Sequence, residues 1–69
     1  MAMAPRYPEV RIRLYSQNPF AWVSAIRQAL RHSHVDDREI VRFTEEALGQ
    51  DEPHRIREIC STWAEIDVR

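Results

Sequence analysis

The fold is decided by the stretch NPFAWVSAIRQALRH, which occupies residues 18–32. Asn18 is suited to accept hydrogen bonds from the free N–H groups of a first helical turn, and Pro19 fits the first position of that turn. Apolar side chains then recur at intervals of three and four, which is the spacing of one helix face. We therefore predict a central helix whose buried face consists of Phe20, Trp22, Val23, Ile26, Ala29 and Leu30.

An alternating segment precedes this helix. Residues 9–15 switch strictly between apolar and polar side chains, which is the pattern of a strand with one buried face. Because a strand that enters a helix through a short loop tends to carry the helix on its apolar side, we expect that side to contact Val23, Ile26 or Leu30. The apolar side holds Val10, Ile12 and Leu14, and the opposite side holds Arg11, Arg13 and Tyr15.

The first eight residues differ from the rest of the chain. Residues 1–8 contain two prolines, two methionines and no periodic pattern, so we predict a flexible N-terminal tail there. The remaining length suffices for one small core, and we predict a single compact domain over residues 9–69.

A second helix begins near residue 36. Asp36 is placed as its N-cap, with Glu39 as the partner that reaches back in a capping box and Val35 with Ile40 as a hydrophobic staple. Gly49 follows the last apolar residue, at the position where a left-handed residue commonly ends a helix. The predicted buried face consists of Ile40, Phe43, Ala47 and Leu48.

A third helix follows the turn at residues 50–53. Asp51 is the predicted N-cap, Pro53 lies in the first turn, and His54 is placed to reach back toward the cap. The predicted buried stripe consists of Ile56, Ile59, Cys60 and Trp63. Because no base neighbours Cys60 in this stripe, we expect an unreactive thiol.

The chain ends on a second alternating segment. Residues 64–69 fit a short strand, and pairing with the first strand would place Glu65 and Asp67 on the same face as Arg11 and Arg13. The direction of this pairing stays open. The prediction is a small single α+β domain in the order β-α-α-α-β, with a two-stranded sheet closed by the two termini.

Composition excludes several classes of function. Ten basic residues against eleven acidic residues give a net charge of -1, which removes the general attraction for phosphates used by small nucleic-acid-binding proteins. A single cysteine, the lack of an apolar run and the lack of metal-ligand spacing predict a cytoplasmic protein with no metal and no cofactor. No catalytic constellation is present, so we predict that the protein is not an enzyme.

Because the core is small, a homodimer would add stability.

Two binding functions fit this sequence. A helix-turn-helix DNA-binding regulator would use Gly49 in its turn and Arg55 and Arg57 on its recognition helix, but carboxylates stand where that helix would enter the groove. A protein-interaction module that binds a basic protein surface fits the charges better. Its predicted partner-binding residues are Glu45, Glu46, Asp51 and Glu52.

The order of the motifs resembles short uncharacterised proteins of bacterial accessory genomes, phages and plasmids. The resemblance covers residues 8–67 and carries no established activity, but it suggests a host defence or replication protein as the partner, and an anti-CRISPR inhibitor is one concrete form of this hypothesis. The partner would then be a host protein whose nucleic-acid groove is occupied by the acidic residues. The features that carry the resemblance are Val10 to Leu14, Asn18 with Phe20, Ala29-Leu30-Arg31, Glu46-Ala47, Asp51 with His54, and Trp63 to Asp67.

Overall fold

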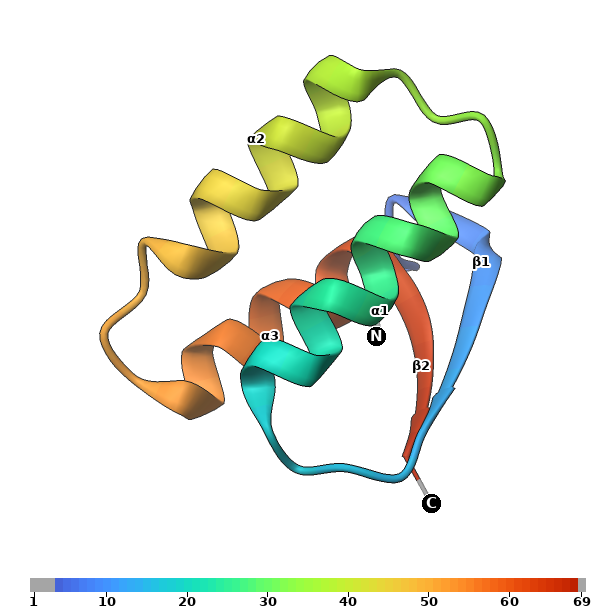
Figure 1. The fold of residues 1–69 in the computed structure, drawn as a ribbon. Helices are drawn as coiled ribbons and strands as arrows, with labels where there is room; N and C mark the ends of the chain where they lie inside the picture. Colours follow the sequence, from blue (N-terminus) through green and yellow to red (C-terminus); the bar gives the residue numbers. More distant parts are fainter. Residues whose placement is uncertain (1–3, 69) are drawn as a thin grey trace.

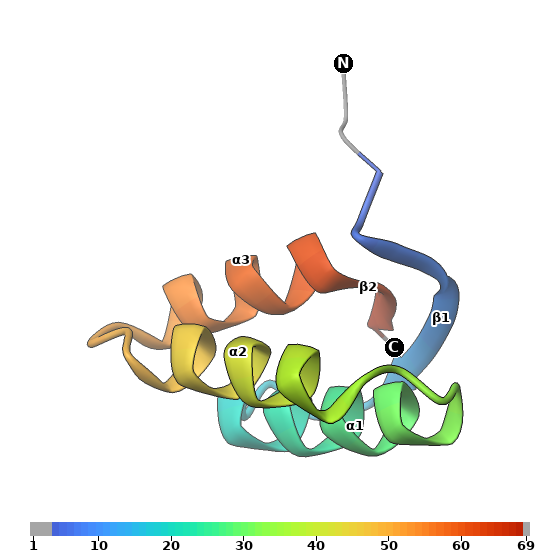
Figure 2. The same ribbon diagram turned by 90° about the horizontal axis from the view of Figure 1, so that it is seen from above.

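A computed structural model describes residues 4–68 of the chain. Its elements occur in the predicted order β-α-α-α-β and form one small α+β globule (Figure 1). Three helices lie side by side, and the two strands lie along one side of them (Figure 2). The elements are β1 (Tyr7–Leu14), α1 (Pro19–His32), α2 (Asp37–Leu48), α3 (Pro53–Trp63) and β2 (Ala64–Val68).

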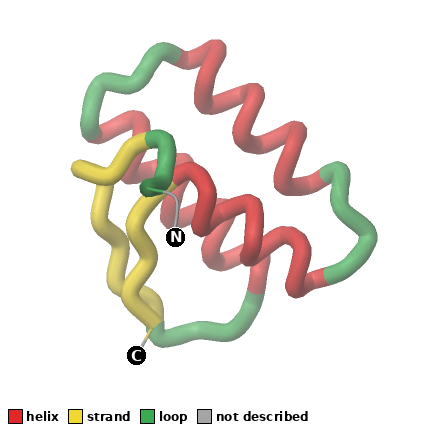
Figure 3. Tube along the Cα trace, turned by 180° about the vertical axis from the view of Figure 1, so that it is seen from behind, coloured by secondary structure: helices red, strands yellow, loops and turns green. Residues whose placement is uncertain are grey.

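The two strands pair in parallel, which the sequence left open. The three helices form the connection between them, so the first and last strands run side by side (Figure 3). Arg11 pairs with Glu65 and Arg13 with Asp67 in the strand register. The predicted match of opposite charges on one face of the sheet is therefore confirmed.

Helix α1 lies in the core as predicted, but it shares the central position with α3, which contacts α1, α2 and β2. Helix α1 contacts α2, α3 and β1, and its residues Ile26 and Leu30 are completely buried. Phe43 of α2 and Cys60 of α3 are also completely buried. The apolar side of β1 packs against the same cluster, as predicted from its alternation.

Strand β1 begins earlier than predicted. Tyr7 and Pro8, which we assigned to the tail, belong to the strand. The Arg6 N–H donates to the carbonyl oxygen of Thr62 at 2.8 Å, and the Tyr7 ring stacks on Trp63 with centroids 6.0 Å apart. The partners that hold this segment come from the far end of the sequence, so its own composition does not reveal them. The predicted tail is described only from residue 4 onward.

Two apolar residues that we predicted to be buried are exposed. Phe20 is 61% exposed and Leu48 is 48% exposed. Each lies about 100° around its helix from the buried stripe, since successive residues turn by about 100°. Phe20 and Leu48 therefore lie at the edge of the apolar face of their helices, although their spacing from the other apolar residues fits the helical pattern.

The first two helix starts are capped as predicted. The Asn18 side chain accepts a hydrogen bond from the Phe20 N–H at 2.9 Å, and Asp36 accepts one from the Arg38 N–H at 2.8 Å. These caps satisfy N–H groups that have no partner within the helix.

The predicted return of Glu39 to the cap of α2 is wrong. The Glu39 carboxylate accepts a hydrogen bond from the Tyr7 hydroxyl at 3.1 Å and forms ion pairs with Arg6 and Arg42. Burial and this hydrogen bond raise the pKa of Tyr7 above its ordinary value. Long-range partners from the start of β1 therefore replace the local capping box.

Two details of the turn between α2 and α3 also differ from prediction. Gly49 has φ of -78° and is not left-handed, because its N–H continues the helical pattern by donating to the Glu45 carbonyl at 3.0 Å. Glu52, not Asp51, is the N-cap of α3, and it forms no side-chain capping bond. The physical reason is Pro53, which forces the residue before it into an extended conformation. His54 accordingly pairs with Glu52 and does not reach back to Asp51.

Helix α1 ends in a Schellman motif with a histidine where glycine is common. His34 has φ of 62°, in the left-handed region that is costly for side chains with a Cβ. Its N–H donates to the Arg31 carbonyl at 3.1 Å, and the Val35 N–H donates to the Leu30 carbonyl at 3.0 Å. The helix therefore ends at a fixed geometry that strains one residue.

We expect His34→Gly to raise the free energy of unfolding by about 0.5–1 kcal/mol. Glycine removes the left-handed strain, and part of this gain is offset by the greater freedom of glycine in the unfolded chain. Urea denaturation followed by circular dichroism measures the difference. Ser33→Gly is the matched control, because Ser33 has φ of -87° and should gain nothing. Equal effects of the two substitutions would show that the left-handed conformation is not the cause.

Candidate partner-binding site

The four predicted partner-binding residues lie around one bend of the chain. Glu45 and Glu46 come from the last turns of α2, and Asp51 and Glu52 from the loop that leads into α3. All four are exposed, and in the sequence they lie on either side of the bend between α2 and α3 that Figure 1 shows. We call these four residues the acidic corner. The fold thus brings the predicted residues together, because the loop between the helices is short.

Most of the acidic corner is free of internal ion pairs. Glu52 Oε2 lies 3.2 Å from His54 Nε2, whereas Glu45, Glu46 and Asp51 form no ion pair within residues 4–68. By contrast, the carboxylate of Glu39 pairs with arginine. The acidic corner therefore keeps carboxylates available for groups outside the chain.

The position of the acidic corner on α2 works against the stability of that helix. The last turn of α2 contains Glu45 and Glu46 and no basic residue. Carboxylates at a helix C-terminus meet the negative end of the helix dipole, which costs about 0.3–1 kcal/mol for each exposed charge. Stabilisation of the helix dipole therefore does not explain the presence of Glu45 and Glu46. Asp51 and Glu52 differ, because they lie next to the positive N-terminal end of α3.

Leu48 is the residue of this region that we assigned wrongly to the core. It is the last residue of α2 and is half-exposed among the carboxylates. An exposed apolar side chain next to charged residues offers contact area of the kind found at the core of an interface, inside its polar rim. The angle of Leu48 around the helix, about 100° from the buried Ala47, is the signal in the sequence that could have identified it.

The arrangement of α2 and α3 does not favour a helix-turn-helix DNA-binding site. The two helices run side by side in opposite directions (Figures 1 and 2), whereas the helices of that motif cross at about 90–120°. Arg57 is also engaged within the fold, because its Nη1 donates to the Gln17 carbonyl at 3.1 Å. Arg55 is exposed. Of the two arginines proposed for DNA, one thus helps to hold the loop between β1 and α1.

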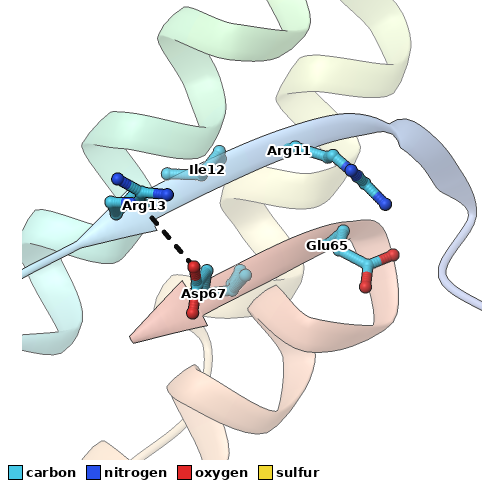
Figure 4. A pocket seen from close by; sticks show the side chains of 6 residues that line it. Arg11, Ile12, Arg13, Glu65 and Asp67 are labelled. Atoms are coloured by element: carbon cyan, nitrogen blue, oxygen red, sulfur yellow. Dashed lines mark ion pairs between the residues drawn. The ribbon is translucent and has the colours of Figure 1, made fainter. Parts of the chain in front are cut away.

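A hollow of about 450 Å³ lies over the sheet (Figure 4). Arg11 and Arg13 reach it from β1, and Glu65 and Asp67 from β2. Arg13 Nε lies 3.7 Å from Asp67 Oδ2, so part of this charge is compensated within the sheet. Because both signs of charge line the hollow in equal number, it has no preference for a ligand of one charge.

The described part of the chain shows neither a reactive thiol nor a metal site. Burial raises the pKa of the Cys60 thiol from 9.0 to about 12, so the thiol stays protonated at neutral pH. Within residues 4–68, no group of three or more histidine, cysteine, aspartate or glutamate side chains is arranged to hold a metal ion. No described helix has the length and apolar character needed to cross a membrane.

Comparison with known proteins adds no relative. No protein-family model, no curated protein and no solved structure matches the chain.

Proposed function

We propose that this protein is a non-enzymatic protein-interaction module whose acidic corner binds a basic surface on a partner protein. The observation that carries the proposal is the set of exposed carboxylates at Glu45, Glu46 and Asp51, which have no ion pair within residues 4–68. Leu48 beside them supplies apolar contact area that the ion pairs alone would lack. Two of these carboxylates disfavour the helix that carries them, which supports a role outside the fold.

The resemblance to proteins of phages and plasmids extends this proposal to a class of partner. A host defence protein with an arginine-rich nucleic-acid groove offers the surface that the acidic corner would fit. We therefore propose an inhibitor of a host defence system, of the anti-CRISPR kind, that acts in the cytoplasm. Such an inhibitor would compete with nucleic acid for the groove and would need no catalytic group.

We expect reversal of charge in the acidic corner to weaken binding to a basic protein surface by roughly tenfold or more. The variant carries Glu46→Lys, Asp51→Lys and Glu52→Lys, so three exposed ion pairs worth about 0.2–1 kcal/mol each are replaced by repulsion. The probe is a synthetic arginine-rich peptide titrated by calorimetry, together with capture of proteins from a bacterial host lysate.

The matched control reverses three exposed carboxylates outside the acidic corner, at Glu9, Glu58 and Glu65. It has the same net charge as the first variant and should keep most of the affinity. Equal losses in the two variants would show that net charge, not the acidic corner, determines binding. Mixed-sequence duplex DNA is titrated in parallel, and tight, salt-sensitive binding of DNA by the parent protein would overturn the proposal in favour of a DNA-binding regulator.

A further inference from the structure

Among the residues whose side chains the structure describes, three of the four well-exposed large apolar residues lie on α1 and α2. Phe20 of α1 is 61% exposed, and Val41 and Leu48 of α2 are 53% and 48% exposed. Helical periodicity places Phe20 on the same side of α1 as Arg27 and Arg31, because intervals of seven and eleven residues are close to whole turns. By the same rule, Val41 and Leu48 share one side of α2.

The two sides form one continuous surface. Helices α1 and α2 are in contact and run in opposite directions (Figures 1 and 2). A groove of about 480 Å³ between them is lined by Arg27 and Arg31 from α1 and by Asp37 and Val41 from α2, among others. Because the helices are antiparallel, Phe20 at the start of α1 and Leu48 at the end of α2 lie at the other end of this surface. We call it the α1–α2 face.

Charge is distributed unevenly along the α1–α2 face. Arg27 and Arg31 lie toward one end and form no ion pair within residues 4–68. Asp37 of α2 lines the same groove but forms no ion pair with either arginine, so this end of the face carries two positive charges against one negative charge. Glu45, which lies one turn from Val41 and borders the same side of α2, is toward the other end and is also unpaired. The face thus has a basic end and an acidic border at its opposite end, with apolar side chains exposed along it.

We propose that the α1–α2 face binds a second copy of this chain in a twofold symmetric dimer. A twofold interface joins the same patch from both copies, so the patch must complement itself. With the second copy turned end for end, Arg27 and Arg31 of each copy approach Glu45 of the other. In this arrangement Phe20 and Leu48 of each copy approach Val41 of the other, because Val41 lines the groove beside Arg27 and Arg31.

The size of the protein gives a physical reason for this association. A core of this size supplies only about 3–5 kcal/mol, and dimerisation adds stability by burying apolar surface that the monomer leaves in water. Tyr15, the fourth of the exposed apolar residues in the described part of the chain, lies in the loop after β1 and is 74% exposed. It lies outside the α1–α2 face, so it offers a comparison residue for the test.

Sedimentation velocity over a range of protein concentrations tests the proposal. We expect the parent to dimerise, and Val41→Asp and Leu48→Asp each to raise the dimer dissociation constant at least about tenfold. Both residues are exposed, so the variants should keep the circular dichroism spectrum of the monomer. Tyr15→Asp carries the same added charge outside the face and should dimerise like the parent. A parent that stays monomeric up to about 1 mM, or equal effects of all three substitutions, would overturn the proposal.

A charge exchange tests the end-for-end arrangement. Arg27→Glu combined with Arg31→Glu should weaken the dimer at least about tenfold, and adding Glu45→Arg to the same chain should restore most of the affinity. Failure of Glu45→Arg to restore any affinity would overturn this arrangement. The result is separable from the proposed function, because the acidic-corner variant described above leaves Glu45 unchanged and should still dimerise. Conversely, the Val41→Asp monomer should still bind the arginine-rich peptide.

Discussion

Leu30→Ala should lower the free energy of unfolding by roughly 2–5 kcal/mol. Leu30 is completely buried on α1, the helix that contacts α2, α3 and β1. Its truncation removes apolar contacts and leaves a cavity that close-packed neighbours fill only in part. Because a domain of this size has a total stability of about 3–5 kcal/mol, the variant should be largely unfolded at moderate temperature.

Urea denaturation measured by circular dichroism and tryptophan fluorescence provides the comparison for Leu30→Ala. Leu48→Ala is the matched control, because it makes the same chemical change on a leucine that is 48% exposed. We expect that control to cost much less than Leu30→Ala at concentrations where the protein is monomeric. If the two substitutions cost the same, α1 is not the centre of the core.

Trp63→Ala should cost roughly 3–5 kcal/mol, the usual range for truncating a buried tryptophan. Trp63 is 3% exposed and meets Phe43 edge to face, with ring centroids 5.5 Å apart. Tyr7 stacks on it at 6.0 Å, and the Arg6 guanidinium carbon lies 4.9 Å from its ring centroid. The side chain therefore joins α2, α3 and the start of β1, and its loss should release all three contacts.

The variant Trp63→Phe tests whether the cost of Trp63→Ala comes from lost volume alone or from the lost aromatic contacts between α2, α3 and β1. Trp63→Phe keeps an aromatic ring and should cost less than Trp63→Ala, because aromatic contacts with Tyr7 and Phe43 remain in part. Amide hydrogen exchange should show faster exchange in residues 6–10 in the alanine variant than in the phenylalanine variant. Unchanged protection of this segment in the alanine variant would mean that the backbone bond to Thr62 alone holds β1 in place.

The proposed surfaces differ in what they require of the chain. The acidic corner needs carboxylates that are exposed and unpaired, and the α1–α2 face needs apolar side chains on adjacent helix sides. Glu45 and Leu48 belong to both surfaces, so dimerisation would engage these two residues and leave the other three carboxylates of the acidic corner for a partner. The effect of Glu45 substitutions on the two activities should therefore differ from the effect of Glu46 substitutions.

Much of the fold follows from local rules that the sequence states directly. Alternation over residues 9–15 and 64–69 predicts two strands, and apolar spacing with Asn18 and Asp36 as caps predicts the starts of two helices. The match of Arg11 and Arg13 with Glu65 and Asp67 predicts which face of each strand is exposed. These features depend on residues close together in sequence or on the fixed period of a strand, so they are readable without coordinates.

Other features were decided only by tertiary structure. The parallel direction of the sheet depends on how three helices pack, and the engagement of Glu39 by Tyr7 and Arg6 depends on a strand brought from a distant part of the chain. Periodicity marks Phe20 and Leu48 as apolar residues on helices but does not say which side of each helix the neighbouring elements cover. That choice is made by packing, because each helix buries the stripe that fits its neighbours and leaves the next stripe in water. The α1–α2 face, and with it the surface proposed for dimerisation, exists for this reason.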